Sequence, residues 1–81
     1  MRTQPKYPVI DLKRTGENIK ELREDGGLTV VELQRQFGFN TPQAIYRWQN
    51  GITLPSVDNL LILANVFGVK IDDILIVKQG V

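Results

Sequence analysis

Residues 41–51, TPQAIYRWQNG, hold the pattern on which the fold depends. Thr41 followed by Pro42 is a typical helix start, and we expect a helix from there to the final glycine of the stretch. Ile45 and Trp48 are three positions apart and share one face of that helix, which we expect to be core. The opposite face carries side chains that can donate or accept hydrogen bonds: Gln43, Tyr46, Arg47 and Asn50.

The polar face of this helix suits base reading in the major groove of DNA. An arginine can donate two hydrogen bonds to guanine, and a glutamine can pair with adenine through both ends of its amide. A solvated face is the simpler interpretation, because most polar helix faces contact only water. The periodicity alone leaves both interpretations open.

Two helices are expected before this stretch. Thr15 can cap the first, over about 16–25, which a pair of glycines ends. The second opens with the capping box Thr29-x-x-Glu32 and ends at Gly38. Together with the helix that follows, it forms a candidate helix-turn-helix.

Two further helices are expected after it. Pro55-Ser56 opens a helix that Gly68 ends, and residues 71–76 form a short fifth helix. The longer of the two has apolar positions that we expect on or near its buried face: Val57, Leu60, Leu61, Leu63, Ala64 and Phe67. The sequence therefore predicts an all-α, five-helix domain.

The chain has 81 residues and a mass of 9.2 kDa, the size of one small domain. We expect the domain to span residues 15–76, between an N-terminal arm at 1–14 and a C-terminal tail at 77–81. Two apolar runs near the ends, YPVIDL and ILIVK, are predicted to pair as short strands within the chain or across a dimer. For the start of the arm, the alternatives are a free tail and entry of Arg2 and Lys6 into a minor groove.

The residue content argues against several kinds of chemistry. The chain has no cysteine and no histidine, so we expect no disulfide, no metal site and no catalytic group built on either. Asp72 and Asp73 are adjacent and point in different directions on a helix, which argues against a paired-carboxylate site. We therefore expect neither enzyme activity nor a cofactor. No stretch has the pattern of a signal peptide or a membrane span, and we expect a cytoplasmic protein.

Residues 28–75, LTVVELQRQFGFNTPQAIYRWQNGITLPSVDNLLILANVFGVKIDDIL, resemble the helix-turn-helix domain of the XRE family, the phage-repressor and Cro-like regulators. The runs RWQNGITLP and LLILANVFGV carry most of the resemblance, which reaches about 60 of the 81 residues when ENIKELREDGG is included. It implies a compact, lambda-repressor-like DNA-binding fold whose recognition helix runs from Thr41 to Asn50.

The resemblance also implies which residues touch DNA. Bases would be contacted by Gln43 and Arg47, with further residues close to the groove: Thr41, Ala44 and Tyr46. Phosphates would be held by Asn50 and by the backbone around Gly51–Thr53. The N-terminus of the second helix at Thr29 would hold another, because free N–H groups and the helix dipole attract anions.

The chain departs from the family pattern at several positions. Gln34 replaces a small residue that is usual in the middle of the second helix, and the turn GFNTPQ is one residue longer than is common. Val30 takes the place of a common glutamine. The acidic residue that usually follows the tryptophan position is Gln49, so Arg23 of the first helix is expected to meet a neutral amide.

By this resemblance we expect a sequence-specific transcription regulator, most simply a repressor. Two copies would place their recognition helices in successive major grooves, about 34 Å apart, on a partly palindromic operator. Since 81 residues leave no room for a separate dimerisation domain, DNA or the helical domains themselves would bring the copies together.

Domains that this sequence resembles also serve as antitoxins that bind a toxin, or as other protein-binding modules. The net charge of only +1, Val30 and the apolar ILIV segment favour that alternative.

Overall fold

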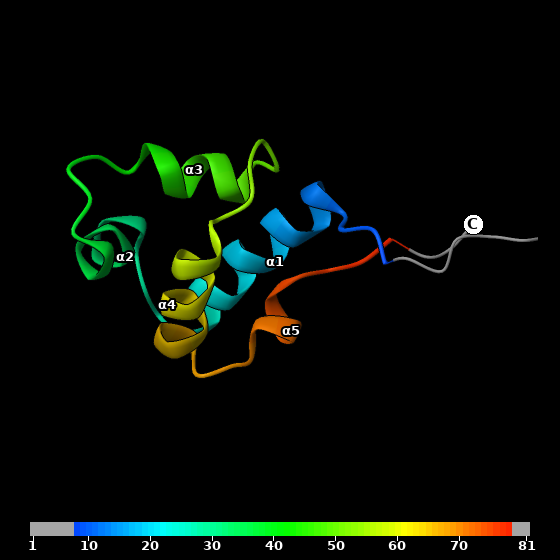
Figure 1. Ribbon diagram of the computed structural model, residues 1–81. Helices are drawn as coiled ribbons and strands as arrows, with labels where there is room; N and C mark the ends of the chain where they lie inside the picture. The colour runs from blue at the N-terminus through cyan, green and yellow to red at the C-terminus, as the bar shows by residue number, and fades with distance from the viewer. Residues whose placement is uncertain (1–7, 79–81) are drawn as a thin grey trace, which may run out of the picture.

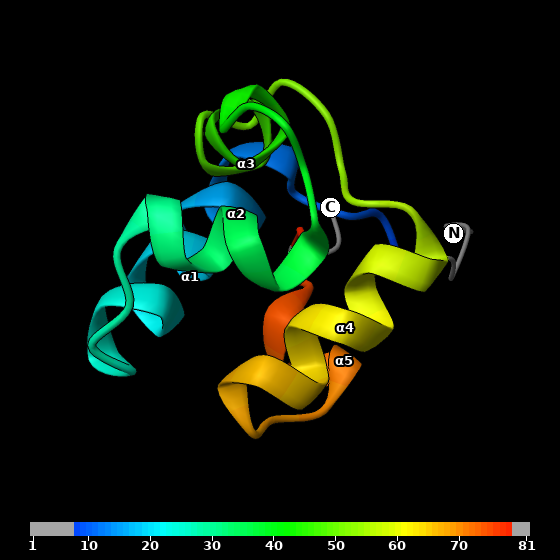
Figure 2. The ribbon, with the colours of Figure 1, turned by 90° about the vertical axis from the view of Figure 1, so that its left-hand side faces the viewer.

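Five helices form the fold of residues 8–78, the part of the chain that the computed structural model describes (Figure 1). In chain order they are α1 (Leu12–Asp25), α2 (Val30–Phe37), α3 (Gln43–Gln49), α4 (Val57–Phe67) and α5 (Ile71–Ile74). Seen from the side of α2, α1 lies behind and α3 above (Figure 2). The predicted all-α fold is confirmed. None of the helices between residues 8 and 78 combines the length and the apolar composition that a membrane-spanning helix requires.

All five helices contribute to one hydrophobic core. Its buried apolar side chains are Ile19, Leu33, Ile45, Trp48, Leu60, Leu63 and Ile74. The Trp48 ring packs edge-on against two other aromatic rings, with centroids 5.3 Å from Phe37 and 6.0 Å from Phe39. Burying one large aliphatic side chain stabilises a fold by about 1.5–3 kcal/mol. Isolated helices of this length are only marginally stable in water, so packing in the core is what stabilises them.

The outer face of α4 differs from the expectation. Leu60 and Leu63 are buried as predicted, but Val57 remains 70% exposed and Leu61 56% exposed. Val57 and Leu61 are one helical turn apart and share a face that points away from the core. The apolar run of α4 is therefore wider than the core can cover.

The capping residues of α2 and α4 act as predicted. At α2, the Glu32 N–H donates to Thr29 Oγ1 over 3.1 Å, and the Thr29 N–H donates to Glu32 Oε1 over 2.8 Å. At α4, Ser56 Oγ accepts a backbone N–H of the first turn. Gly38 and Gly68 end these helices with φ of +69° and +70°, a left-handed backbone that glycine adopts without steric cost.

The start of α1 corrects the sequence-based boundary. The helix begins at Leu12, because Asp11 is the N-cap and accepts a hydrogen bond from the Arg14 N–H. Thr15, the predicted cap, is buried, and its hydroxyl binds Ile76 instead. Its Oγ1 accepts from the Ile76 N–H at 2.9 Å and donates to the Ile76 carbonyl at 3.3 Å. The last part of the expected arm therefore belongs to α1.

Two other helix boundaries also differ. α3 begins one residue after Pro42 and has no side-chain cap, so the prediction that Thr41 opens it was wrong. α5 ends at Ile74, two residues early, because Leu75 is already extended with φ −79° and ψ 126°. The chain then continues towards the N-terminal segment.

The two ends of the described chain lie side by side. Ile10 and Val77 form an isolated antiparallel bridge, which we call the terminal bridge. Two backbone hydrogen bonds of 2.7 Å flank it: Asp11 N–H to the Ile76 carbonyl and Lys78 N–H to the Val9 carbonyl. Pairing of the terminal segments within the chain is confirmed, and between residues 8 and 78 it consists of this one bridge. Arg2 and Lys6, the candidates for a minor groove, lie outside the described residues.

Candidate nucleic-acid interface

A close contact between backbones seats α3 on α1. A Cβ atom on Gly16 of α1 would stand 2.3 Å from the Trp48 carbonyl oxygen and 2.7 Å from that of Gln49. Gly51, just after α3, has φ +72°, and a Cβ atom there would stand 2.8 Å from the Lys13 Cα. Only glycine fits at these two positions, so the contact with α1 determines the position and orientation of α3. Sequence reasoning gave Gly16 no role; the available signal was a glycine inside a predicted helix.

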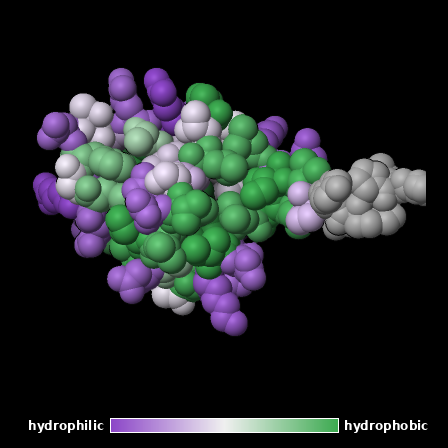
Figure 3. Space-filling view, in the orientation of Figure 1, coloured by the Kyte–Doolittle hydropathy of each residue, from purple (hydrophilic) through white to green (hydrophobic). Residues whose placement is uncertain are grey.

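The two faces of α3 agree with the prediction. Ile45 and Trp48 are buried. Ala44 is half-buried against the core, and Thr41 is exposed in the turn before the helix. The opposite row is exposed: Gln43, Tyr46, Arg47 and Asn50. Among residues 8–78, no hydrogen bond or ion pair engages the side chains of this row, and hydrophilic atoms project above the edge where α3 lies (Figure 3).

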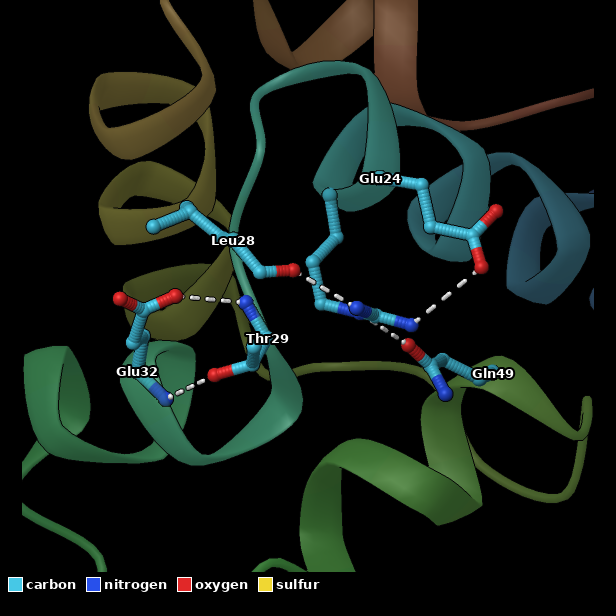
Figure 4. A network of polar contacts seen from close by, with 6 residues as sticks. Glu24, Leu28, Thr29, Glu32 and Gln49 are labelled. Carbon is cyan, nitrogen blue, oxygen red and sulfur yellow. Dashed lines mark hydrogen bonds and ion pairs between the residues drawn. The ribbon is translucent and has the colours of Figure 1, made fainter.

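A buried polar contact ties α3 to α1 from the inside (Figure 4). Arg23 is buried and donates from Nε to Gln49 Oε1 over 2.8 Å and from Nη1 to the Leu28 carbonyl over 2.7 Å. The Glu24 carboxylate lies 3.8 Å from Nη2 of the same arginine. The expected meeting of Arg23 with a neutral amide is confirmed, and it fixes the C-terminal end of α3.

Gln34 closes the long turn between α2 and α3. Its Nε2 donates to the Phe39 carbonyl over 3.0 Å. The rings of Phe37 and Phe39 stack with centroids 5.0 Å apart, and both lie against Trp48. The Gln34 side chain therefore supports the turn between α2 and α3.

The N-terminus of α2 already holds an anion. The Glu32 carboxylate accepts from the Thr29 N–H, and this bond, helped by the Thr29 hydroxyl, lowers the pKa of Glu32. A phosphate arriving here would meet that carboxylate. Because Thr29 is occupied by the capping box, the first-turn N–H groups of Val30 and Val31 are the donors left for an outside acceptor.

The backbone after α3 is largely used within the protein. The Gly51 N–H donates to the Trp48 carbonyl over 3.1 Å, and the Ile52 N–H donates to the Arg47 carbonyl over 2.9 Å. The Thr53 N–H reaches the Arg47 carbonyl only over 3.4 Å, and Thr53 is exposed. Of these three backbone N–H groups, that of Thr53 has the longest hydrogen bond within the protein.

Charge is distributed unevenly around α3. Arg35 of α2 and Arg47 of α3 are exposed, and the chain from residue 33 to 57 contains no acidic residue. Beside the C-terminal end of α3, an open hollow is lined mainly by charged residues of α1: Lys13, Glu17, Lys20, Glu21, Glu24, Gln49 and Asn50. The acidic face of α1 thus borders Asn50, whereas Gln43 lies at the other end of α3.

The sequence of this helical core matches the model of a known family. The family is described as helix-turn-helix, and the match covers residues 19–74. It includes α2, α3 and the turn between them, and it extends from within α1 to the end of α5. Comparison with curated proteins finds no match to the chain.

Proposed function

Because the chain belongs to the helix-turn-helix family of XRE-, Cro- and lambda-repressor-like domains, we propose that it reads a specific DNA sequence with α3 in the major groove. The family is one of DNA-binding regulators, and we propose that this member represses transcription. The exposed row on α3 carries the proposal, since its side chains have free donors and stand opposite a face that the core holds in place.

Two side chains of this row would read bases. Gln43 and Arg47 are four residues apart, which at 1.5 Å per residue is about 6 Å along the helix. That distance is close to two base-pair steps of about 3.4 Å. Gln43 would pair with adenine and Arg47 with guanine, while Thr41, Ala44 and Tyr46 would stand near the groove wall.

Phosphate contacts would fix the position of α3 on the duplex. Asn50, Thr53 and the N–H groups of the first turn of α2, directly after Thr29, would supply neutral donors. Arg35 would supply a charge on the neighbouring helix. Because ten Lys and Arg residues are nearly balanced by nine acidic residues, which leaves a net charge of +1, the chain should bind non-specific DNA weakly. Its affinity should also fall less steeply with salt than that of a strongly basic protein.

A random-duplex selection tests base reading directly. The bound pool is sequenced for wild type, for Gln43→Ala with Arg47→Ala, and for a control with Asn65→Ala and Lys70→Ala. The control removes the same functional groups, one amide and one positive charge, from exposed positions at the α4–α5 end. A motif enriched by wild type and by the control, but not by the α3 variant, is the expected result. Enrichment of the same motif by all three proteins would contradict base reading by α3.

Single substitutions then separate base contacts from phosphate contacts. Arg47→Ala should cost about 1–3 kcal/mol on the selected site and relax the preference at one base pair. Asn50→Ala should weaken binding to all sequences alike. An equal loss on every sequence for Arg47→Ala would contradict its assignment to a base.

A protein-binding role, including that of an antitoxin, is the second candidate. The exposed Val57 and Leu61 favour it, because clustered apolar side chains on a surface mark contacts with other proteins. If folded wild-type protein enriches no duplex, the assignment moves to this role.

A further inference from the structure

Gln49, the last residue of α3, has a buried side chain of which one end is used inside the protein. The residue is 9% exposed, and its Oε1 accepts the hydrogen bond of 2.8 Å from Arg23 Nε. An arginine only donates hydrogen bonds, so the end of the amide that faces it is the oxygen. The amide nitrogen, Nε2, therefore points away from Arg23 (Figure 4).

The two N–H groups of Gln49 Nε2 have no acceptor in the part of the chain that the structure describes. Among residues 8–78, this nitrogen donates no hydrogen bond, and the Arg23 contact is the one that the side chain makes. Native proteins rarely leave a buried donor unsatisfied, because its lost hydration is then not replaced. The acceptor for Nε2 therefore has to come from solvent or from a ligand.

The open hollow beside the C-terminal end of α3 gives a ligand access to this amide. Gln49 and Asn50 both line the hollow, although they are neighbours in the chain. Arg23, towards which Oε1 is turned, does not line it, so Nε2 is the polar end of Gln49 left to face the hollow. Asn50 is exposed and offers a second amide with free donors.

The charges around the hollow nearly cancel. Three glutamates of α1 line it, together with Lys13 and Lys20. Arg23 adds a third cation behind the lining, where its Nη2 lies 3.8 Å from the Glu24 carboxylate. An ion of either sign is therefore attracted only weakly from a distance, and hydrogen bonding to the two amides selects the ligand. A DNA phosphate supplies acceptor oxygens and comes to this end of α3 with the duplex.

We propose that Gln49 donates from Nε2 to the DNA phosphate that Asn50 contacts, with Arg23 holding the Gln49 amide in the required orientation. The contact rests on the proposed function, because the phosphate arrives only when α3 lies in the major groove. The buried arginine fixes the donor before DNA binds, so the side chain loses little conformational freedom on binding. Gln49 thus positions the duplex although it lies outside the exposed row of α3.

Gln49→Glu separates the two ends of the side chain. The carboxylate keeps an acceptor for Arg23 Nε and makes the hydrogen bond charge-assisted, so urea unfolding should show a fold at least as stable as wild type. The same change removes both donors and places a negative charge against the phosphate. Affinity for the selected duplex and for a scrambled duplex should therefore fall by the same factor, about tenfold or more.

Asn65→Asp is the matched control. It exchanges an amide for a carboxylate and adds the same charge, at an exposed position on α4 near the α4–α5 end. Salt screens a charge that lies away from the duplex, so the affinity should stay within about twofold of wild type. A loss as large for this control as for Gln49→Glu would show that net charge alone lowers the affinity, and would overturn the proposal.

Neutral methylphosphonates, placed at one phosphate of the selected duplex at a time, identify the contact. At the phosphate that both side chains hold, the losses caused by Gln49→Glu and by Asn50→Ala should each shrink to less than about threefold. At every other phosphate both losses should persist in full. This agreement on one phosphate is a result that a merely structural role of Gln49 would not produce.

Three outcomes would overturn the contact and leave base reading by α3 intact, because the enriched motif remains. The first is a folded Gln49→Glu that binds as wild type does. The second is a Gln49→Glu loss that is equal on every methylphosphonate duplex. The third is a loss that shrinks at a different phosphate from that of Asn50→Ala. Wild type that enriches no duplex would overturn both proposals.

Discussion

Gly16→Ala tests whether the backbone contact between α1 and α3 determines stability. Two effects oppose each other at this position. Alanine is about 1 kcal/mol better than glycine inside a helix. The new Cβ would, however, stand 2.3 Å from the Trp48 carbonyl oxygen, whereas ordinary contacts begin at 3.4 Å. α1 and α3 would have to part by about 1.1 Å, the difference between these two distances.

The clash should outweigh the gain in helix propensity. Overpacking costs about 1–3 kcal/mol, and we take the upper end because backbone carbonyls cannot rotate away as a side chain does. The net loss is then about 2 kcal/mol, which for a domain of this size lowers Tm by about 8–16 °C. Because α3 moves with the contact, affinity for a selected duplex should fall as well.

Urea unfolding followed by the fluorescence of Trp48, the single tryptophan, measures the loss. Gly26→Ala is the control, because Gly26 has φ −82° and its Cβ would meet its nearest neighbour at 3.4 Å. The control should change the free energy of unfolding by less than about 0.5 kcal/mol. If Gly16→Ala is as stable as wild type, the two helices can part without cost and the reasoning fails.

Three further substitutions test other contacts. Gln49→Ala leaves the buried Arg23 Nε without its acceptor, so urea unfolding should show a loss of about 1.5–3 kcal/mol, and a loss near zero would contradict this. The pKa of Glu32 in the folded state is lowered, so the charge of Glu32 stabilises the fold at pH values above its ordinary pKa of 4.5. This stabilisation is lost as the pH falls through the pKa of the folded state. The stability advantage of wild type over Glu32→Gln should therefore be larger at pH 7 than at pH 3, whereas a difference independent of pH would refute the capping role of the charge. Thr15→Val removes the acceptor of the Ile76 N–H, and hydrogen exchange at that amide should become about tenfold faster or more, with an unchanged rate as the contrary result.

Local patterns in the sequence were sufficient for much of the helical frame. The spacing of Ile45 and Trp48 predicted the buried face of α3, since helical periodicity does not depend on distant residues. The Thr29–Glu32 capping box was equally local. The contact of Arg23 with Gln49 was expected from the family resemblance, which pairs these two positions across 26 residues.

Features set by distant residues could not be predicted in the same way. Asp11 and Thr15 are both good capping residues, and the choice between them depends on Ile76, which binds the Thr15 hydroxyl from 61 positions away. Leu61 stands in a continuous apolar run beside Leu60, and only the packing of the other helices decides which of the two is covered. The exposed polar row on α3 was therefore foreseen, but the exposed apolar side chains on α4 were not.

Because the terminal bridge brings residues 9 and 78 together, the same arrangement of helices could be built from a chain in which the helices follow one another in a different order. Val9 and Lys78 are hydrogen-bonded neighbours, so a short linker could join the ends without stretching the fold. New ends could be cut at Gly26–Gly27, an exposed turn between α1 and α2. The resulting circular permutant would begin with α2 and finish with α1, and it would keep every helix contact described above. The same closeness of the ends would allow the whole domain to be inserted into a surface loop of another protein.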